Sequence, residues 1–151
     1  LFERFHIITR AELESREEII YETYAKSINI EALTMIDMAS KQIIPAVVEY
    51  SRKLAKTVLD VKAAGVEPVV QSELLVKVNS KLTEMKEALT VLQKEEAAAS
   101  SIEDVKEQAF RYKDLVMPAM DALRAPADEL EMMMDKEDWP FPTYGDLMFE
   151  V

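Results

Sequence analysis

The sequence contains no cysteine, one histidine and only two glycines among its 151 residues. Without cysteine, the chain can form neither disulfides nor thiolate metal sites, and it has no thiol nucleophile. Gly65 and Gly145 are too far apart to build the glycine-rich loop whose backbone amides hold a phosphate. His6 is the only imidazole, which excludes a histidine-pair metal site and favours an ordinary surface role for this side chain.

Long apolar runs are also missing. The longest one, Ile43 to Val48, has six residues, whereas a membrane-spanning helix needs about 20. No basic, then apolar, then small-residue pattern opens the chain, so a secretory signal is not indicated. We therefore expect a cytoplasmic protein, and the start at Leu1 without an initiator methionine predicts that it was cut from a larger one.

Basic residues are scarce, and the deficit lies mainly at one end. The net charge is −11, and residues 128–151 carry eight acids and one base. A field of this sign repels phosphate backbones and anionic lipids, which argues against nucleic acid and membrane surfaces as partners.

What the chain does contain is helix-forming residues with helical spacing. From Ser27 to Tyr50, apolar residues recur every three or four positions, and a second apolar line runs beside the first, which predicts a central helix covered on a wide face. Asp37 precedes Lys41 by four residues, the spacing of a helical ion pair. Pro45 interrupts this pattern without changing its phase, so we expect a kink rather than an end.

The ends of the first helices are marked by capping residues. Thr9 and Glu12 form a capping box, and Leu13, Ile20, Tyr24 and Ile28 are predicted to be the buried side of the helix that follows. Ser27 and Asn29 are both acceptable caps, so we expect a short break between this helix and the central one. Gly65 predicts that the central helix ends at Ala63 or Ala64.

Two further helices are predicted from seven-residue apolar spacing. One seam runs from Leu75 to Leu92, and its helix is expected to end within Ala97 to Ser101. Ser100 and Glu103 then spell a second capping box, and a last seam runs from Ile102 to Leu123. Pro118 and Pro126 interrupt this last helix, so we expect it to bend and to restart after Ala125.

The predicted fold is all-α: an elongated antiparallel bundle of about four long helices, followed by an extended tail rich in proline and aromatic residues. We assign residues 1–8 to a connector from an upstream domain, 9–137 to the bundle and 138–151 to the tail. The tail is too apolar to remain in solvent, and so it must dock on this bundle or on a neighbouring domain. Its apolar side chains are those of Trp139, Phe141, Tyr144, Leu147, Met148 and Phe149.

No catalytic set emerges from the remaining residues. Glu3 and His6 have the Glu-x-x-His spacing of di-metal bundles, but a second copy is missing and chance explains this one better. Acid pairs such as Glu17 with Glu18 and Glu95 with Glu96 are typical of solvated helix faces. Met35, Met85 and Met120 are predicted to fill the core, whereas Met132 to Met134 cannot all face one core, so at least one of them is expected to meet the tail or another domain.

Several strings of the sequence carry a resemblance to a known family. They are INIEALTMIDMA (28–39), QIIPAV (42–47), VMPAM (116–120), ADELE (127–131) and WPFPTYGDLMF (139–149). Together they resemble the C-terminal region of type III glutamine synthetases, the large bacterial form of that ligase. The likeness spans nearly the whole chain, although Pro126 departs from the continuous helix expected there.

The resemblance implies a parent enzyme that joins ammonia to glutamate with ATP and Mg²⁺ or Mn²⁺, in a site shared between subunits of a large oligomer. None of that family's catalytic motifs is present here, so no catalytic, cofactor-binding or metal-binding residue is assigned. The chain is expected to be inactive alone, to pack on the upstream catalytic domain and to support homo-oligomer assembly. Candidate interface residues are Asn29, Glu31, Thr34, Trp139, Phe141, Tyr144 and Phe149.

Two alternatives remain open. An autonomous helical scaffold or adaptor would recruit a basic partner through its acidic aromatic tail. A metal-binding bundle enzyme would contain stoichiometric iron or manganese, and it ranks last.

Overall fold

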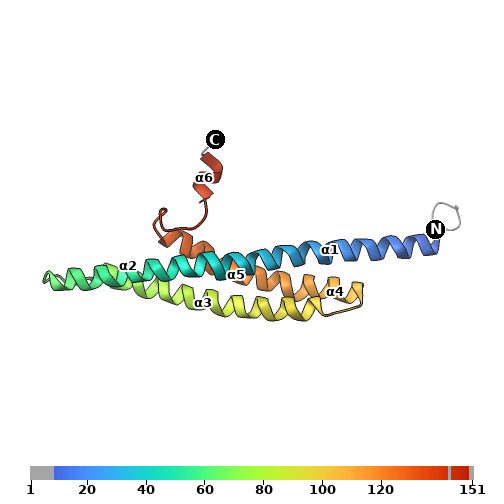
Figure 1. Cartoon of the computed structure of the whole chain (residues 1–151), viewed down its shortest axis with the longest axis horizontal. Coiled ribbons are helices and arrows are strands. Elements are labelled where there is room, and N and C mark those ends of the chain that lie inside the picture. Colours follow the sequence, from blue (N-terminus) through green and yellow to red (C-terminus); the bar gives the residue numbers. More distant parts are fainter. Residues whose placement is uncertain (1–8, 143, 150–151) are drawn as a thin grey trace.

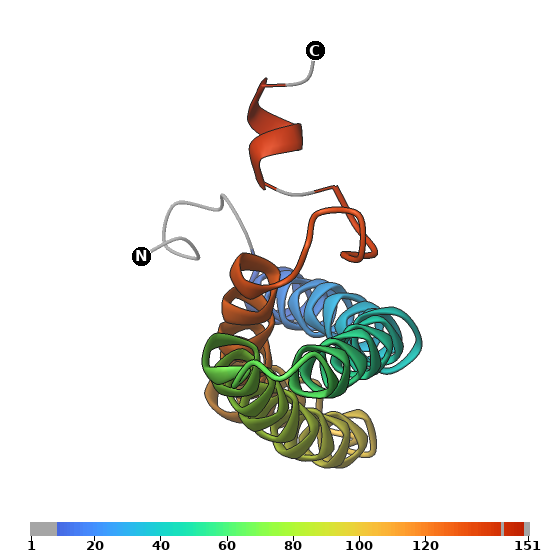
Figure 2. The same cartoon turned by 90° about the vertical axis from the view of Figure 1, so that its left-hand side faces the viewer.

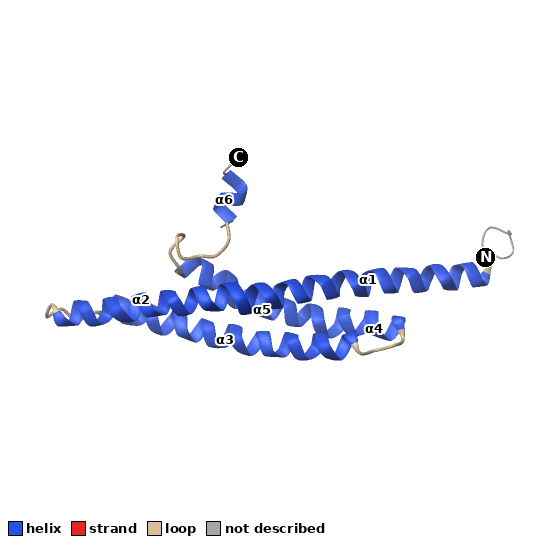
Figure 3. Ribbon diagram, viewed as in Figure 1, coloured by secondary structure: helices blue, strands red, loops and turns tan. Residues whose placement is uncertain are grey.

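The computed structural model describes residues 9–142 and 144–149, and these residues form helices and turns without a strand. The helices are α1 (Arg10–Met38), α2 (Ile44–Ala63), α3 (Val69–Ser100), α4 (Val105–Arg111), α5 (Met117–Met133) and α6 (Tyr144–Phe149). Two π-helical turns, η2 (Ala39–Ile43) and η3 (Tyr112–Val116), join α1 to α2 and α4 to α5. The all-α prediction is confirmed (Figure 3).

The long helices form three rods that lie side by side in an elongated bundle (Figures 1 and 2). Rod 1 comprises α1, η2 and α2, rod 2 is α3, and rod 3 comprises α4, η3 and α5. At 1.5 Å per residue, rod 1 is about 80 Å long and rod 2 about 48 Å. α3 packs mainly on α2 and α5, and α4 packs on α1. At its N-terminal end, rod 1 extends past the other two rods (Figure 1).

The predicted break between Ser27 and Asn29 is wrong, because α1 passes through these residues without interruption. Neither side chain acts as a cap. The Ser27 hydroxyl donates to the Thr23 carbonyl at 2.9 Å, the back-bond of a residue inside a helix. The Asn29 amide turns away from its own backbone toward rods 2 and 3.

Both π turns stand two residues before a proline, at Pro45 and Pro118. Proline has no N–H to donate, and its ring crowds the carbonyl four residues earlier. In each rod, the residue before the proline donates its N–H to the carbonyl five residues back, from Ile44 to Ala39 and from Met117 to Tyr112. The wide turn accommodates each proline, and the rod continues past it, as expected for Pro45.

Pro126 does not restart the last helix, contrary to the prediction, because α5 is continuous from Met117 to Met133. Its ring is buried in line with Leu123 and Leu130 on the core side of α5. Packing of this face offsets the one backbone hydrogen bond that proline removes.

The helix ends agree with the sequence at Thr9 and at the end of α3, and they differ at the start of α4. Thr9 and Glu12 form the capping box, and hydrogen bonds from the Thr9 backbone and hydroxyl lower the pKa of the Glu12 carboxyl. The third helix ends at Ser100, within the predicted stretch. The second capping box is wrong: Asp104 caps α4 by accepting from the Glu107 N–H at 2.7 Å, while the Ser100 hydroxyl donates to Ala97.

Gly65 ends α2 with φ of +83°. The Gly65 N–H donates to the Lys62 carbonyl and the Val66 N–H to the Val61 carbonyl, which is a Schellman motif. A Cβ at this position would meet nothing within 4 Å, so the demand for glycine comes from the backbone alone.

Gly65→Ala is therefore expected to lower the free energy of unfolding by about 1–2 kcal/mol, the cost of the left-handed conformation for an L-residue. Such a change lowers the melting temperature of a chain of this size by about 2–8 °C. Thermal unfolding followed by circular dichroism measures it, with Ala64→Ser in the same turn as the control. Equal melting temperatures for Gly65→Ala and the parent chain would show that the turn relaxes without strain.

The core follows the predicted seams along most of their length. Its fully buried side chains include Val47, Val78, Met85, Leu89, Leu92, Tyr112, Val116 and Leu130. Met35 and Met120 pack against this core from partly buried positions. Leu13 and Ile20, predicted to be buried, are exposed, because Leu13 lies beyond the contacts of rod 3 and Ile20 lies on a side of α1 that rod 3 does not cover.

Candidate interface around the C-terminal segment

The chain after α5 turns back over the middle of the bundle before α6 points away from it (Figures 1 and 2). Met134 leaves the helix with an extended backbone, and Asp135 organises the turn that follows. The Asp135 carbonyl accepts from the N–H groups of Asp138 and Trp139, and its carboxylate accepts from the Glu137 N–H at 2.9 Å. This turn directs Trp139 and Phe141 back onto the bundle.

Trp139 and Phe141 are partly buried and pack against the hydrophobic core. They wall an apolar cavity of about 260 Å³, together with residues of α1, η2, α3 and α5. The side chains of Met35, Ile43, Met85 and Leu123 also line it. The sequence required the tail to dock, and its first half docks on this bundle.

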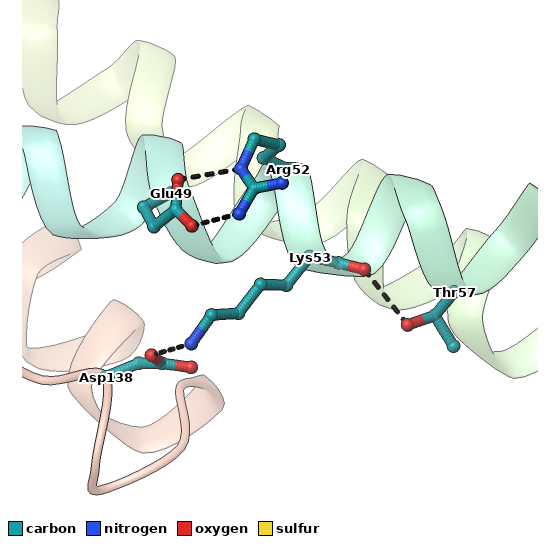
Figure 4. Close-up of polar contacts among 5 residues, drawn as sticks. All are labelled: Glu49, Arg52, Lys53, Thr57 and Asp138. Atoms are coloured by element: carbon teal, nitrogen blue, oxygen red, sulfur yellow. Dashed lines mark hydrogen bonds and ion pairs between the residues drawn. The ribbon is translucent and has the colours of Figure 1, made fainter.

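Polar contacts hold the base of the tail beside α2. The Lys53 ammonium pairs with the Asp138 carboxylate, whose side chain is only 20% exposed (Figure 4). The hydrogen bond from Lys53 to Asp138 raises the pKa of the lysine. The Tyr50 hydroxyl donates to the Met133 carbonyl at 3.2 Å, and burial, with Asp135 and Asp138 nearby, raises the pKa of this phenol.

The tail differs from the extended prediction in its second half, where residues 144–149 form α6. The Lys136 ammonium pairs with the Asp146 carboxylate and so ties α6 to the end of α5. Leu147 and Met148 are each 70% exposed. Leu147 also lines the cavity beside Trp139 and Phe141, so α6 faces the cavity through Leu147 and leaves Met148 exposed.

Trp139 is the only tryptophan, so its fluorescence reports tail docking directly. Phe141→Ser is expected to shift the emission to the red, because it removes an apolar contact at the cavity wall. Asp138→Asn is the matched control and is expected to change the emission little, since an ion pair with an exposed lysine is worth about 0–1 kcal/mol. A red shift in the control equal to that of Phe141→Ser would mean that charge, rather than apolar packing, docks the tail.

The remaining candidate residues fall into three environments. Asn29 lies inside the bundle, where its amide donates to Glu96 at 2.9 Å and to the Tyr112 hydroxyl oxygen at 2.7 Å. Glu31 and Thr34 are exposed and line a hollow of about 440 Å³ between α1 and α5. Tyr144 and Phe149 belong to α6, but their side chains lie outside the described part of the structure.

Other sequence expectations can be placed in the same way. Glu17 and Glu18 are exposed as predicted, but Glu95 and Glu96 are partly buried because they contact Arg111 and Asn29. Lys41 pairs with Asp37. Of the three successive methionines, Met132 is 89% exposed and Met134 is buried, so they do not share one core. The connector 1–8, with Glu3 and His6, lies outside the described residues.

Within residues 9–142 and 144–149, no group of three or more acidic or histidine side chains is placed to hold a metal ion. Gly65 belongs to a helix-ending turn and not to a phosphate loop. In the same residues, no helix is long and apolar enough for a membrane span.

The fold and the site define a class: an elongated helical domain with an aromatic C-terminal segment that packs on its bundle. The comparisons with known proteins give the family that it resembles. A family model described as the glutamine synthetase C-terminal domain matches residues 1–62, which include all of α1 and η2.

Three curated relatives match the chain along nearly its whole length. A glutamine synthetase of Butyrivibrio fibrisolvens is 34% identical over 153 residues, covering 100% of this chain and 22% of the relative. One from Bacteroides fragilis is 29% identical, covering 95% and 20%. A type-3 glutamine synthetase of Dictyostelium discoideum is 31% identical, covering 99% and 21%.

The resemblance to the C-terminal region of type III glutamine synthetases is therefore confirmed. The chain spans about a fifth of the length of the curated relatives that it matches.

Proposed function

We propose that this chain is the non-catalytic C-terminal domain of a type III glutamine synthetase. The observation that carries the proposal is the match of the whole chain to about a fifth of each relative, in a helical domain whose described residues form no metal-binding group. The parent enzyme would join ammonia to glutamate at the expense of ATP and release glutamine.

ATP and Mg²⁺ or Mn²⁺ belong, in this proposal, to the catalytic region that precedes the helical domain in the same polypeptide. The parent enzyme is a cytoplasmic homo-oligomer. The helical domain packs on the catalytic region and supports assembly of the oligomer.

The surfaces offered for assembly are the tail and the hollow beside Glu31 and Thr34. The tail suits this role because Leu147 and Met148 are exposed on a six-residue helix. A helix this short is not stable alone in water, so contact with another surface would stabilise it. Tyr144 and Phe149 stay candidates for the same contact.

The proposal is tested by measuring glutamine formation from glutamate, ammonia and ATP with the isolated chain and with the parent polypeptide. We expect turnover only for the parent. Turnover by the isolated chain, absent from a mock purification, would overturn the non-catalytic role.

The acidic tail favours one alternative, an autonomous helical adaptor that recruits a basic partner. Residues 128–151 carry eight acids and one base, a stronger imbalance than in the rest of the chain. The two proposals differ in the size of the native polypeptide, which is near 17 kDa for the adaptor and several times larger for the synthetase.

A further inference from the structure

The first three turns of α1 project past the ends of the other rods, and Glu17 pairs them with rod 3 through Lys106 (Figure 1). Every residue from Arg10 to Ile20 is exposed, whereas the same helix buries Ala25, Ile28 and Ala32 further along. Rod 2 ends at Ser100 and rod 3 begins at Val105, level with this boundary. The first contacts from rod 3 are the ion pair between Lys106 and Glu17 at 3.1 Å and the ring contact between Phe110 and Tyr21.

The projecting turns carry large apolar side chains in solvent. Leu13 is 48% exposed and Ile20 is 67% exposed. These two residues are seven positions apart, so they share one side of the helix. Tyr24 continues the line, and its hydroxyl donates to the Met117 sulfur at 3.0 Å, so the exposed stripe joins the bundle surface at Met117. Arg16 and Glu17 lie between Leu13 and Ile20 on this side, so the exposed strip combines apolar and charged side chains.

Carboxylates lie along one side of the strip. Glu14, Glu17, Glu18, Glu103 and Asp104 line a hollow of about 430 Å³ at the start of α4. Lys106, which also lines it, pairs with Glu17. A complementary surface therefore has an apolar part and basic side chains beside it, because unlike charges steer and align such contacts.

The comparisons with known proteins indicate which partner would carry the complementary surface. The family model is that of a C-terminal domain and its match includes all of α1, while about four-fifths of each relative lies outside the matched region. In such a polypeptide, a preceding region is joined to α1 through residues 1–9 and is held near the projecting turns at a high effective concentration.

We propose that residues 10–20 form the docking surface for the region that precedes the helical domain in the same polypeptide. Leu13 and Ile20 insert into an apolar site on that region, and basic residues there face Glu14, Glu18 and Glu103. The inference rests on the proposed function. It adds a contact surface that the sequence did not identify, since Leu13 and Ile20 were expected to lie inside the bundle.

Cysteine labelling tests this contact, because the chain has no cysteine of its own. Ile20→Cys and Val76→Cys replace residues that are 67% and 70% exposed, so neither substitution disturbs the core. Each variant is made in the isolated chain and in the full-length parent, and maleimide labelling of the peptide is followed by mass spectrometry. We expect equal rates for the two sites in the isolated chain, and labelling of Ile20→Cys about tenfold slower than that of Val76→Cys in the parent.

Two outcomes would overturn the inference. Equal labelling of both sites in a parent several times larger than this chain would leave the proposed function standing and remove the docking surface. Concentration-dependent protection of Ile20→Cys in the isolated chain would assign the strip to a second copy instead. The mass of the parent is measured first, and a native polypeptide near 17 kDa would remove the proposed function itself.

Discussion

Tyr112→Ala is expected to lower the free energy of unfolding by about 3–5 kcal/mol, the usual cost of truncating a buried aromatic side chain. Tyr112 is 1% exposed and is the largest fully buried side chain among the described residues. It lies at the start of η3, where all three rods meet, and its hydroxyl oxygen accepts from Asn29. Burial raises the pKa of this phenol. Denaturant unfolding followed by circular dichroism measures the loss.

Two control variants separate packing from hydrogen bonding. Tyr112→Phe keeps the ring and removes one acceptor from Asn29, which still donates to Glu96, so we expect a loss of about 1 kcal/mol. Phe110→Ala changes a neighbouring ring that is 44% exposed, and we expect a smaller loss than for Tyr112→Ala. Equal losses for Tyr112→Ala and Phe110→Ala would contradict the placement of Tyr112 at the junction of the rods.

Deleting residues 138–151 is expected to weaken assembly of the parent oligomer by about tenfold or more, a change of about 1.4 kcal/mol at the interface. The same deletion should lower the helical content of the isolated chain only slightly, because α6 is the only helix removed. Sedimentation of the parent at graded concentrations measures assembly, and circular dichroism measures helicity. Assembly that is equal with and without the tail would refute the role of the tail.

Point variants then assign that effect to one side of the tail. Met148→Ser changes the exposed side of α6, so we expect weaker assembly at an unchanged melting temperature. Trp139→Ala changes the inward side and should lower the melting temperature, since Trp139 packs on the core. If Met148→Ser left assembly intact, the exposed face of α6 would not be the contact.

The sequence predicted most of the elements governed by local chemistry, the exception being the capping box at Ser100. Thr9 with Glu12 and Gly65 with its neighbours were assigned correctly, because a cap or a left-handed turn depends on a few adjacent residues. The seven-residue seam of α3 likewise identified a core that includes Val78, Met85, Leu89 and Leu92.

Other features depend on contacts far apart in the chain. Asn29 has the chemistry of a cap, but Glu96 and Tyr112, which lie 67 and 83 positions away, engage its side chain inside the bundle. The same holds for Leu13 and Ile20, whose periodicity shows an apolar face but does not show how far the neighbouring rods extend. Rod lengths decide whether the N-terminal part of α1 is exposed, and rod 1 is longer than expected because α1 has no break near Ser27.

The candidate interface was predicted in part. The aromatic tail was identified from its composition, but which of its side chains face the bundle depends on the turn at Asp135. The link between Lys53 and Asp138 joins residues 85 positions apart, and no local signal marks it. The sequence did not identify the projecting strip on α1, because apolar residues have the same helical spacing whether they face a core or solvent.

The central claim is that this chain belongs to a larger ligase, and the mass of the native polypeptide tests it most directly. An antibody raised against the chain would detect that polypeptide in a lysate of the source cells, and the captured material would be assayed for ATP-dependent glutamine formation. We expect a species several times larger than 17.2 kDa that carries this activity. A species near 17 kDa without glutamine-forming activity would contradict it.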